Sequence, residues 1–349
     1  METEVVESIV FKGFLVPLKV ILSSHFRWFI AISLIIFGLV RCVMQLEEDY
    51  VPLGFYSGTY RTIRMVINNS NAIIHIAVVL FALDWSSFTH YLRQMSKLQL
   101  EKHEKTVAQI NKERRIKLLF CLSSAIIYAV LICYKLFLGE IKVNMFLLNL
   151  SDCLTKMSHI FFLNIISDVC ICLKAAFQLV TSQLKDFPKS TPDSTKLHRL
   201  RYCRLLHSHA VRATRHAEKF LCFYISWYYF QYIMYNMANF VEVLGDKHRY
   251  NWRSGSFFIW DTINLSYLTI KLVAVSELSA NGLEDLYEIS YDVNSIKLQF
   301  ETHIFFNRMQ LNNVGFTFAK LFFINTNFIA SLLTLSLTIV LALANFLQC

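Results

Sequence analysis

Long apolar runs, separated by short charged connections, dominate the chain from end to end. A helix needs about 20 mostly apolar residues to cross a membrane, and seven segments approach that length. They are 28–46, 65–83, 118–134, 157–180, 220–241, 257–275 and 321–349. The fourth and sixth each contain two charged residues, and one of the two could be re-entrant. The pattern predicts an all-α integral membrane protein, with seven transmembrane helices in a single domain over residues 1–349.

The charged connections predict how these helices are oriented. Lys and Arg outnumber Asp and Glu by five in 93–117 and by six in 185–219. Since positively charged connections stay in the cytoplasm, we predict that both are cytoplasmic, together with 277–308. These connections follow the second, fourth and sixth spans. The N-terminal segment 1–27 is therefore predicted in the cytoplasm and the C-terminus on the extracellular side.

An amphipathic pattern within 277–308 predicts one further helix. Its apolar positions follow helical spacing, and this helix is expected to lead directly into the last span. These positions are Ile289, Val293, Ile296 and Phe300. The connection 185–219 also carries four histidines whose spacing matches no zinc site, so we interpret them as part of a solvated basic helix near anionic lipid. They are His198, His207, His209 and His216.

The composition excludes several classes of protein. Hydrophobic residues make up 55% of the chain and charged residues 17%, below the quarter or so that soluble domains carry. The net charge of +9 lies between apolar spans, where it orients helices and does not indicate nucleic acid as a partner. Nine cysteines without paired spacing argue against a disulfide framework. No phosphate loop, metal-ligand motif or nucleophile with a partnered base is present, so we predict no enzyme, cofactor or metal centre.

The last span closes with the run Thr338-Ile339-Val340-Leu341-Ala342-Leu343-Ala344-Asn345-Phe346. This run resembles the signature of the insect gustatory receptor family, which reads Thr-Tyr, five hydrophobic residues, then Gln-Phe. Thr338 and Phe346 match, while Ile339 and Asn345 take the places of Tyr and Gln. The upstream Ile324-Asn325 also resembles the family pattern. The chain is thus identified as a divergent gustatory receptor, or gustatory-receptor-like protein, of the insect chemoreceptor superfamily.

The resemblance implies a receptor that gates ions directly, with four subunits that each contribute the last helix, 321–349, to a pore. On a helical wheel, the polar residues of this helix fall within about 40° of one direction. The candidate pore-lining residues are Asn327, Ser331, Thr334, Thr338 and Asn345, with Leu341 on the same stripe. Hydroxyl and amide groups replace part of an ion's water, and an apolar ring can gate by dewetting. The alternative is that small polar residues on this stripe pack helices together.

The outer halves of the second to sixth spans combine aromatic and hydrogen-bonding residues, which suit a small organic ligand. The candidate ligand-binding residues are His75, His159, Trp227, Tyr232, Tyr235, Asn236, Trp260, Asp261 and Asn264. Asp261 is the strongest of them, because an ionisable group within a span is costly and usually functional. Each has a plainer alternative: aromatic residues also form belts at membrane interfaces, and Asp261 could end a helix and face water.

Three functions remain open from the sequence. The first is a gustatory-type chemosensory receptor of the plasma membrane, a ligand-gated nonselective cation channel that forms a homo- or heterotetramer with related subunits. The second is a non-conducting accessory or structural subunit with the same fold. The third is a G-protein-coupled receptor, which the inverted orientation and the missing Asp-Arg-Tyr-like and Asn-Pro-x-x-Tyr-like motifs disfavour. The receptor channel would also bind a small organic ligand and contact membrane lipid.

Overall fold

A computed structural model of the chain describes residues 83–138, 143–187, 192–245, 252–291, 295–311 and 314–348, together with Ile32 and Ile36. Apart from Ile32 and Ile36, the first span and all but the last residue of the second lie outside the described residues, and so does His75. The described part is almost entirely helical. Its elements are α6 (Trp85–Ser96), η2 (Leu100–Lys102), α7 (Glu104–Leu138), α8 (Val143–Lys185), α9 (Asp193–Gly245), α10 (Trp252–Ala280), α11 (Leu283–Tyr291), α12 (Ile296–Gln310), β1 (Thr317–Phe318), β2 (Phe322–Phe323) and α13 (Thr326–Gln348).

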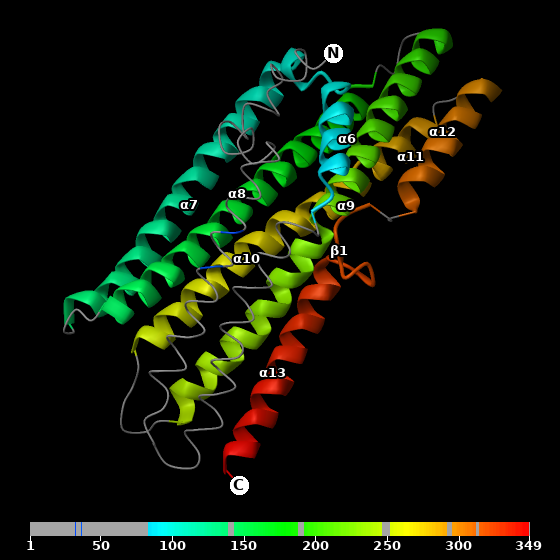
Figure 1. The fold of residues 1–349 in the computed structure, drawn as a ribbon. Helices are drawn as coiled ribbons and strands as arrows, with labels where there is room; N and C mark the ends of the chain where they lie inside the picture. The colour runs from blue at the N-terminus through cyan, green and yellow to red at the C-terminus, as the bar shows by residue number, and fades with distance from the viewer. Residues whose placement is uncertain are drawn as a thin grey trace.

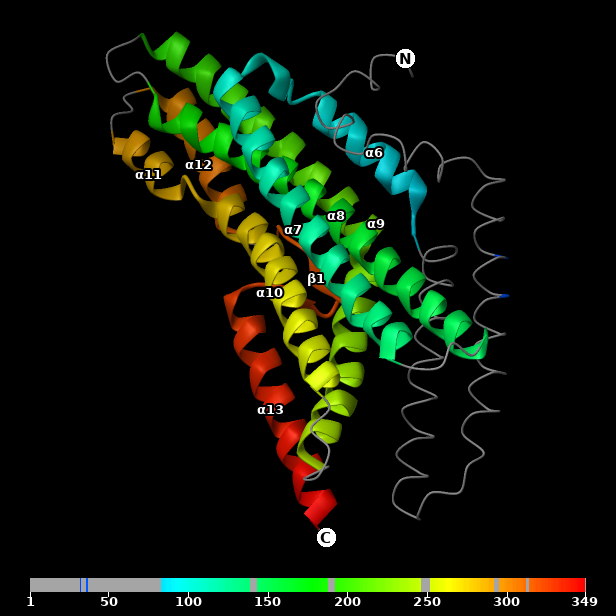
Figure 2. The ribbon, with the colours of Figure 1, turned by 90° about the vertical axis from the view of Figure 1, so that its left-hand side faces the viewer.

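Four long helices, α7 to α10, run lengthwise beside one another and form the body of the fold (Figure 1). Helix α8 packs against the other three, and the short helix α6 lies across α9. Helices α11 and α12 pair at one end of the bundle, while α13 follows α9 toward the other end (Figure 2). The interior is filled by aliphatic and aromatic residues of α8 and α9.

Three described segments are long and apolar enough to cross a membrane. They are Glu104–Ile132, Thr155–Lys185 and Gly255–Tyr291, and they contain most or all of the third, fourth and sixth predicted spans. Helices α8 and α10 are continuous through the charged residues that interrupted the sequence pattern. Neither helix turns back on itself within its predicted span.

The helices extend well beyond the spans predicted from hydropathy. Helix α9 has 53 residues and α8 has 43, about 80 Å and 65 Å at 1.5 Å per residue. The hydrocarbon core of a bilayer is about 30 Å thick. The basic connection 185–219 is therefore mostly the first half of α9. A hydropathy pattern ends where charge begins, whereas the backbone hydrogen bonds of a helix continue through charged residues.

The start of the last helix differs from the prediction. Helix α13 begins at Thr326 and not at residue 321, because Phe322–Phe323 pairs with Thr317–Phe318 in a short antiparallel hairpin. The backbone amide of Ala319 donates to Ser226 Oγ on α9 at 2.6 Å, which fastens the hairpin to the bundle. The Asn325 side chain accepts from the Phe328 amide at 3.0 Å and caps the helix. The second strand of the hairpin is itself apolar, so the uncharged run that begins at residue 321 did not reveal it.

The amphipathic helix predicted across Ile289 and Phe300 is two helices. Ile289 belongs to α11, and α12 begins only at Ile296. Ile296 and Phe300 are 82% and 66% exposed, so the part of the predicted apolar stripe on α12 faces away from the bundle, whereas Ile289 packs against the core. The buried face of α12 includes Leu298, Phe305 and Met309 instead. Helix α12 ends at Gln310, and the hairpin separates it from α13.

His207 is buried at the junction of α8, α9 and α12, so its interpretation as a solvated residue is wrong. Its ring lies between Phe177 and Phe305, with ring-centroid distances of 5.9 Å and 5.4 Å. Its Nε2 atom is 3.2 Å from the carbonyl oxygen of Ser279. Burial lowers the pKa of His207 to about 4, because the charged ring loses its water. The histidine is neutral in the folded chain at physiological pH.

The stability of the fold is expected to decrease as pH falls from about 6.5 to about 4. In this window the unfolded chain binds a proton at His207 that the folded chain does not. Above pH 6.5 neither state is charged, and below pH 4 the loss is complete, at about 3 kcal/mol. The measurement is the unfolding midpoint in detergent from pH 7.5 to 4.5 for the wild type and His207→Gln. An unchanged pH slope in the variant would contradict the assignment.

Candidate functional site

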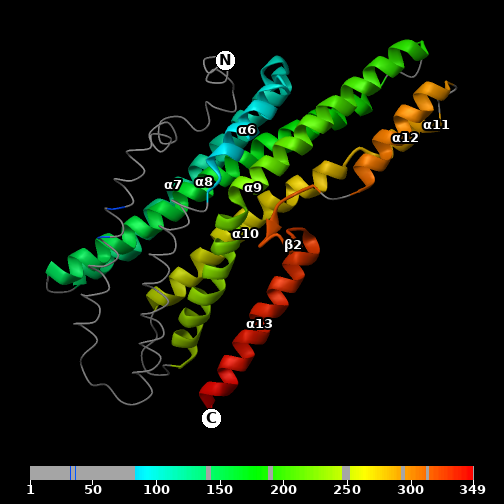
Figure 3. The same ribbon diagram turned by 45° about the vertical axis from the view of Figure 1, so that its right-hand side comes forward.

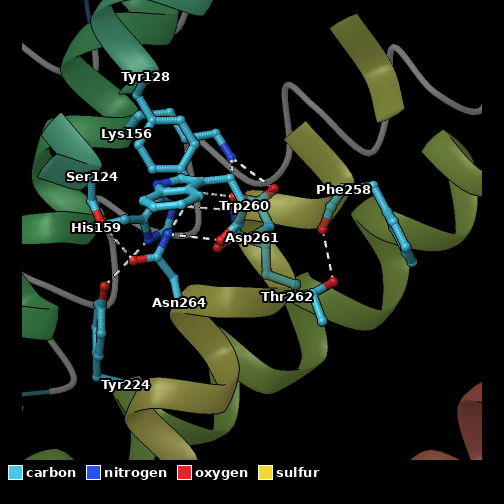
Figure 4. A network of polar contacts seen from close by, with 11 residues as sticks. Ser124, Tyr128, Lys156, His159, Tyr224, Phe258, Trp260, Asp261, Thr262 and Asn264 are labelled. Carbon is cyan, nitrogen blue, oxygen red and sulfur yellow. Dashed lines mark hydrogen bonds and ion pairs between the residues drawn. The ribbon is translucent and has the colours of Figure 1, made fainter. Parts of the chain in front are cut away.

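A small cavity lies between the four long helices, where polar side chains of all of them converge (Figure 4). It is lined by Tyr128, Lys156, His159, Ile160, Leu163, Tyr228, Gln231, Tyr232, Asp261 and Asn264. The space open to a water-sized molecule is about 30 Å³, which holds about one water. An organic ligand needs several hundred Å³. Side chains that line this cavity must therefore move for such a ligand to enter.

Asp261 of α10 is the acidic group of the cavity and is held from two sides. The Lys156 ammonium of α8 lies 3.0 Å from each of its carboxylate oxygens, and the Tyr128 hydroxyl of α7 donates to the same carboxylate. The side chains of Lys156 and Asp261 are 15% and 13% exposed. The charges of the pair cancel. Asp261, for which the sequence showed no partner, is therefore paired with a base in the fold.

Asn264 lies one turn after Asp261 on α10 and ties α10 to α7. Its amide nitrogen donates to the Tyr128 hydroxyl at 3.1 Å and to the Trp260 carbonyl at 2.9 Å. Its amide oxygen accepts from Ser124 Oγ at 3.0 Å. Asp261 and Asn264 share Tyr128 as a partner, so any displacement of Asp261 also affects the contact between α7 and α10.

The opposite wall of the cavity is formed by His159 of α8 and by residues of α9. The His159 ring nitrogens lie 3.0 Å from Gln231 Nε2 and 3.3 Å from the Tyr224 hydroxyl. This arrangement makes His159 Nε2 an acceptor and Nδ1 a donor. The Gln231 Oε1 atom is buried and has no hydrogen-bond partner within the described part of the chain. A buried acceptor on a cavity wall is suited to a donor that a ligand brings.

The structure brings four of the predicted ligand-binding residues together at this cavity: His159, Tyr232, Asp261 and Asn264. Trp227 and Trp260 do not line it; Trp227 packs beside Phe230 and Trp260 stacks on Phe120. Tyr235 and Asn236 follow on α9, but their side chains lie outside the described ones, as His75 lies outside the described residues.

Sequence reasoning missed most of the remaining cavity residues. Lys156 lies one residue before the predicted fourth span. A basic residue at that position is usually interpreted as contacting the membrane surface. Tyr128 sits in an uncharged span among apolar neighbours, and no local signal marks it. Gln231 and Tyr228 belong to the aromatic fifth span that the sequence did single out. The residues missed are Tyr128, Lys156, Ile160 and Leu163.

The other charged residues of the spans form a second ionic cluster between α7, α8 and α10. Asp168 accepts from Arg114 at 2.8 and 2.9 Å and from Lys117 at 2.7 Å. Glu113 pairs with Lys174 at 2.6 Å and with Lys271 at 3.1 Å. Asp168, Lys174 and Lys271 are therefore partners in helix packing and do not line the cavity.

Helix α13 faces the bundle with only part of its surface. Phe328, Ile329 and Leu332 are half-buried against the core. Asn327, Ser331, Thr334, Thr338 and Leu341 of the predicted pore-lining stripe are exposed, and the Asn345 side chain lies outside the described ones. The hydroxyls of Thr334 and Thr338 donate to the carbonyls of Ala330 and Thr334 at 2.9 Å each. Their oxygen lone pairs remain available to water or an ion.

Across the described ranges, no group of three or more His, Cys, Asp or Glu residues is arranged to hold a metal ion. Among the cysteines whose side chains are described, five are buried free thiols and Cys153 is half-buried. They are Cys121, Cys153, Cys170, Cys172, Cys203 and Cys222.

Known structures share this fold, although sequence comparison finds no match among protein-family models or curated proteins. The olfactory receptor OR5 of the insect Machilis hrabei, in complex with eugenol, is 13% identical with a TM-score of 0.54. The alignment covers 93% of this chain and 91% of that one. A second structure of the same receptor is 12% identical, with a TM-score of 0.54. The alignment covers 92% of this chain and 90% of that one. At this identity the likeness shows the fold alone: the chain has the fold of an insect olfactory receptor, and it contains apolar helices long enough to cross a membrane.

Proposed function

We propose that the chain is a chemosensory receptor of gustatory type that acts as a ligand-gated, nonselective cation channel of the plasma membrane. Four copies, of this chain or of related subunits, would surround one pore. The main observation behind the proposal is a polar cavity among helices α7, α8, α9 and α10, in a chain with the fold of an insect olfactory receptor. The gustatory type is supported by the run from Thr338 to Phe346, and the pore by the polar stripe of α13.

Helix α9 supports the proposed coupling, because it carries cavity residues on one face and pore-helix contacts on another. Tyr228 lines the cavity. Its neighbour Tyr229 contacts Phe328 of α13 edge-to-face, with ring centroids 5.4 Å apart. The Tyr229 hydroxyl also lies 2.6 Å from Thr269 Oγ1 on α10. A ligand that binds the open state more tightly would shift α9 and α10, and the contact between Tyr229 and Phe328 would transmit that shift to α13.

The stripe on α13 is expected to control the current. In cells that express this chain alone, Thr338→Ala and Asn345→Ala are expected to change the relative permeability of cations, since both variants remove oxygen atoms from the pore wall. Leu333→Ala is the control, because Leu333 is exposed and lies about 140° around the helix from Thr338. Whole-cell recording at several cation compositions makes the measurement. Equal effects of all three substitutions would contradict pore lining.

The alternative of an accessory subunit makes a different prediction for the same recordings. The degenerate signature, with Ile339 and Asn345 in place of Tyr and Gln, favours it. Current would then be absent from the chain alone and would appear with a related subunit, unaffected by substitutions on the stripe. Current that survives in excised patches without GTP counts against a G-protein-coupled mechanism.

A further inference from the structure

Among the described residues, two aromatic rings and one carboxylate form a cage around the Lys156 ammonium. Its Nζ atom lies 5.0 Å from the Tyr128 ring centroid and 5.6 Å from that of Phe257. The two rings are stacked with centroids 6.1 Å apart, and Asp261 closes the cage at 3.0 Å. We call Tyr128, Phe257 and Asp261 the ammonium cage. Figure 4 shows Lys156 beside Tyr128 and Asp261, and all three residues line the cavity.

A cage of this composition recognises ammonium groups in general. Ring faces attract a cation within about 6 Å of their centroids, and the carboxylate supplies the opposite charge. An ammonium group from a ligand would find the same partners as the lysine does. Exchange of one ammonium for the other leaves the Asp261 carboxylate paired, so the exchange avoids the penalty of an unpaired buried charge.

Lys156 is suited to leave the cage when a ligand enters. Its charge is carried on a flexible stem of four carbons, and its side chain is partly exposed, at 15%. The cavity holds about one water while the lysine is in place. Departure of the lysine side chain would enlarge the cavity and vacate the cage in one movement.

We propose that the site binds a small protonated primary amine, and that Lys156 is a built-in competitor for the same cage. This inference rests on the proposed function, because it names the ligand class of that cavity. The buried Gln231 Oε1 atom, which lacks a described hydrogen-bond partner, lies on the same cavity and accepts a second donor from the amine. A neutral ligand would leave Asp261 without a counter-ion once Lys156 moved, so the cage discriminates against it.

Removal of the competitor is expected to increase amine affinity. Lys156→Met removes the competing ammonium group, so the cage without a cation should bind n-butylamine about tenfold or more tightly than the wild type does. The full chain in detergent at pH 7.5 is titrated with n-butylamine, and its unfolding temperature is recorded. The variant should be less stable than the wild type without amine, and the amine should restore its stability. n-Butanol, of similar shape but uncharged, should not.

Two further variants make the experiment specific. Lys174→Met removes another ion-paired lysine of α8 and should show no gain in amine binding. The double variant Lys156→Met/Asp261→Asn lacks the carboxylate and should lose the rescue. If Lys156→Met does not fold, Lys156→Gln, whose amide can still donate to Asp261, takes its place with the same expectation. Equal rescue by n-butanol, equal rescue of Lys174→Met, or no rescue at all would overturn the proposal.

The outcome separates this inference from the proposed function. Rescue by n-butylamine without any current would support the amine site and contradict the channel. Current evoked by uncharged compounds, together with no amine rescue, would support the channel and overturn the amine site. The binding measurement uses no current, so neither result depends on the other.

Discussion

Replacement of Asp168 by asparagine is expected to destabilise the folded chain by roughly 3–5 kcal/mol. The Asp168 side chain is 1% exposed, and it is the described acidic partner of both Arg114 and Lys117. The Lys117 side chain is itself 5% exposed. An asparagine of the same size takes one partner from Arg114 and leaves the Lys117 ammonium buried without its described negative partner. Burial of an unpaired charge is far costlier than loss of a surface pair.

The measurement is the unfolding midpoint of purified protein in mixed detergent, with a double variant as control. Asp168→Asn/Lys117→Met removes one of the two cations and should recover part of the lost stability, because its effect is not the sum of the single effects. A destabilisation below about 1 kcal/mol for Asp168→Asn would mean that water reaches the cluster. The ion pairs would then resemble surface pairs, which contribute little.

Replacement of Phe305 by alanine is expected to lower stability by about 3–5 kcal/mol. Phe305 of α12 is fully buried, and its ring packs beside His207 of α9 with centroids 5.4 Å apart. Alanine there opens a cavity in the seam that joins α12 to the bundle. The loss should appear both in the unfolding midpoint and in early proteolysis of the segment around α11 and α12.

Phe300→Ala is the matched control on the same helix. Phe300 is 66% exposed, so its removal should change the stability of the isolated chain by less than about 0.5 kcal/mol. If the cytoplasmic extensions, including 289–308, pack the subunits of the proposed tetramer together, Phe300→Ala should instead reduce the fraction of tetramer in mild detergent. Equal losses of stability for the two variants would contradict the assignment of buried and exposed faces.

Much of the fold could be predicted from the sequence, because apolar runs of membrane length dominate composition. The helical positions of the third to sixth spans agree with α7 to α10. The ends of the helices could not be predicted in this way, since charged residues such as those between Asp193 and Lys219 are compatible with helix. The hairpin before α13 was also hidden, because Phe322 and Phe323 pair through backbone atoms that hydropathy does not register.

The candidate site was predictable only in part. Asp261 stood out because an acid in an apolar span needs an explanation, and His159 and Asn264 stood out as polar residues in spans. Their partners did not, because Tyr128 and Lys156 lie 133 and 105 residues from Asp261 along the chain. A single sequence contains no signal for pairing across such distances. Asp168 and Lys174 likewise form ion pairs with residues of α7 and not with each other.

The loose attachment of α13 has a consequence for how the protein is made. Helix α13 extends away from the other helices (Figure 3), and from Leu333 to Leu341 every described side chain of this helix is exposed. It is also the last of the described helices to leave the ribosome, when the bundle of α7 to α10 is already synthesised. A newly made monomer would display Ser331, Thr334 and Thr338 to lipid until other subunits arrive. The helix that we propose as pore wall would thus also distinguish an orphan monomer from an assembled receptor during quality control in the cell.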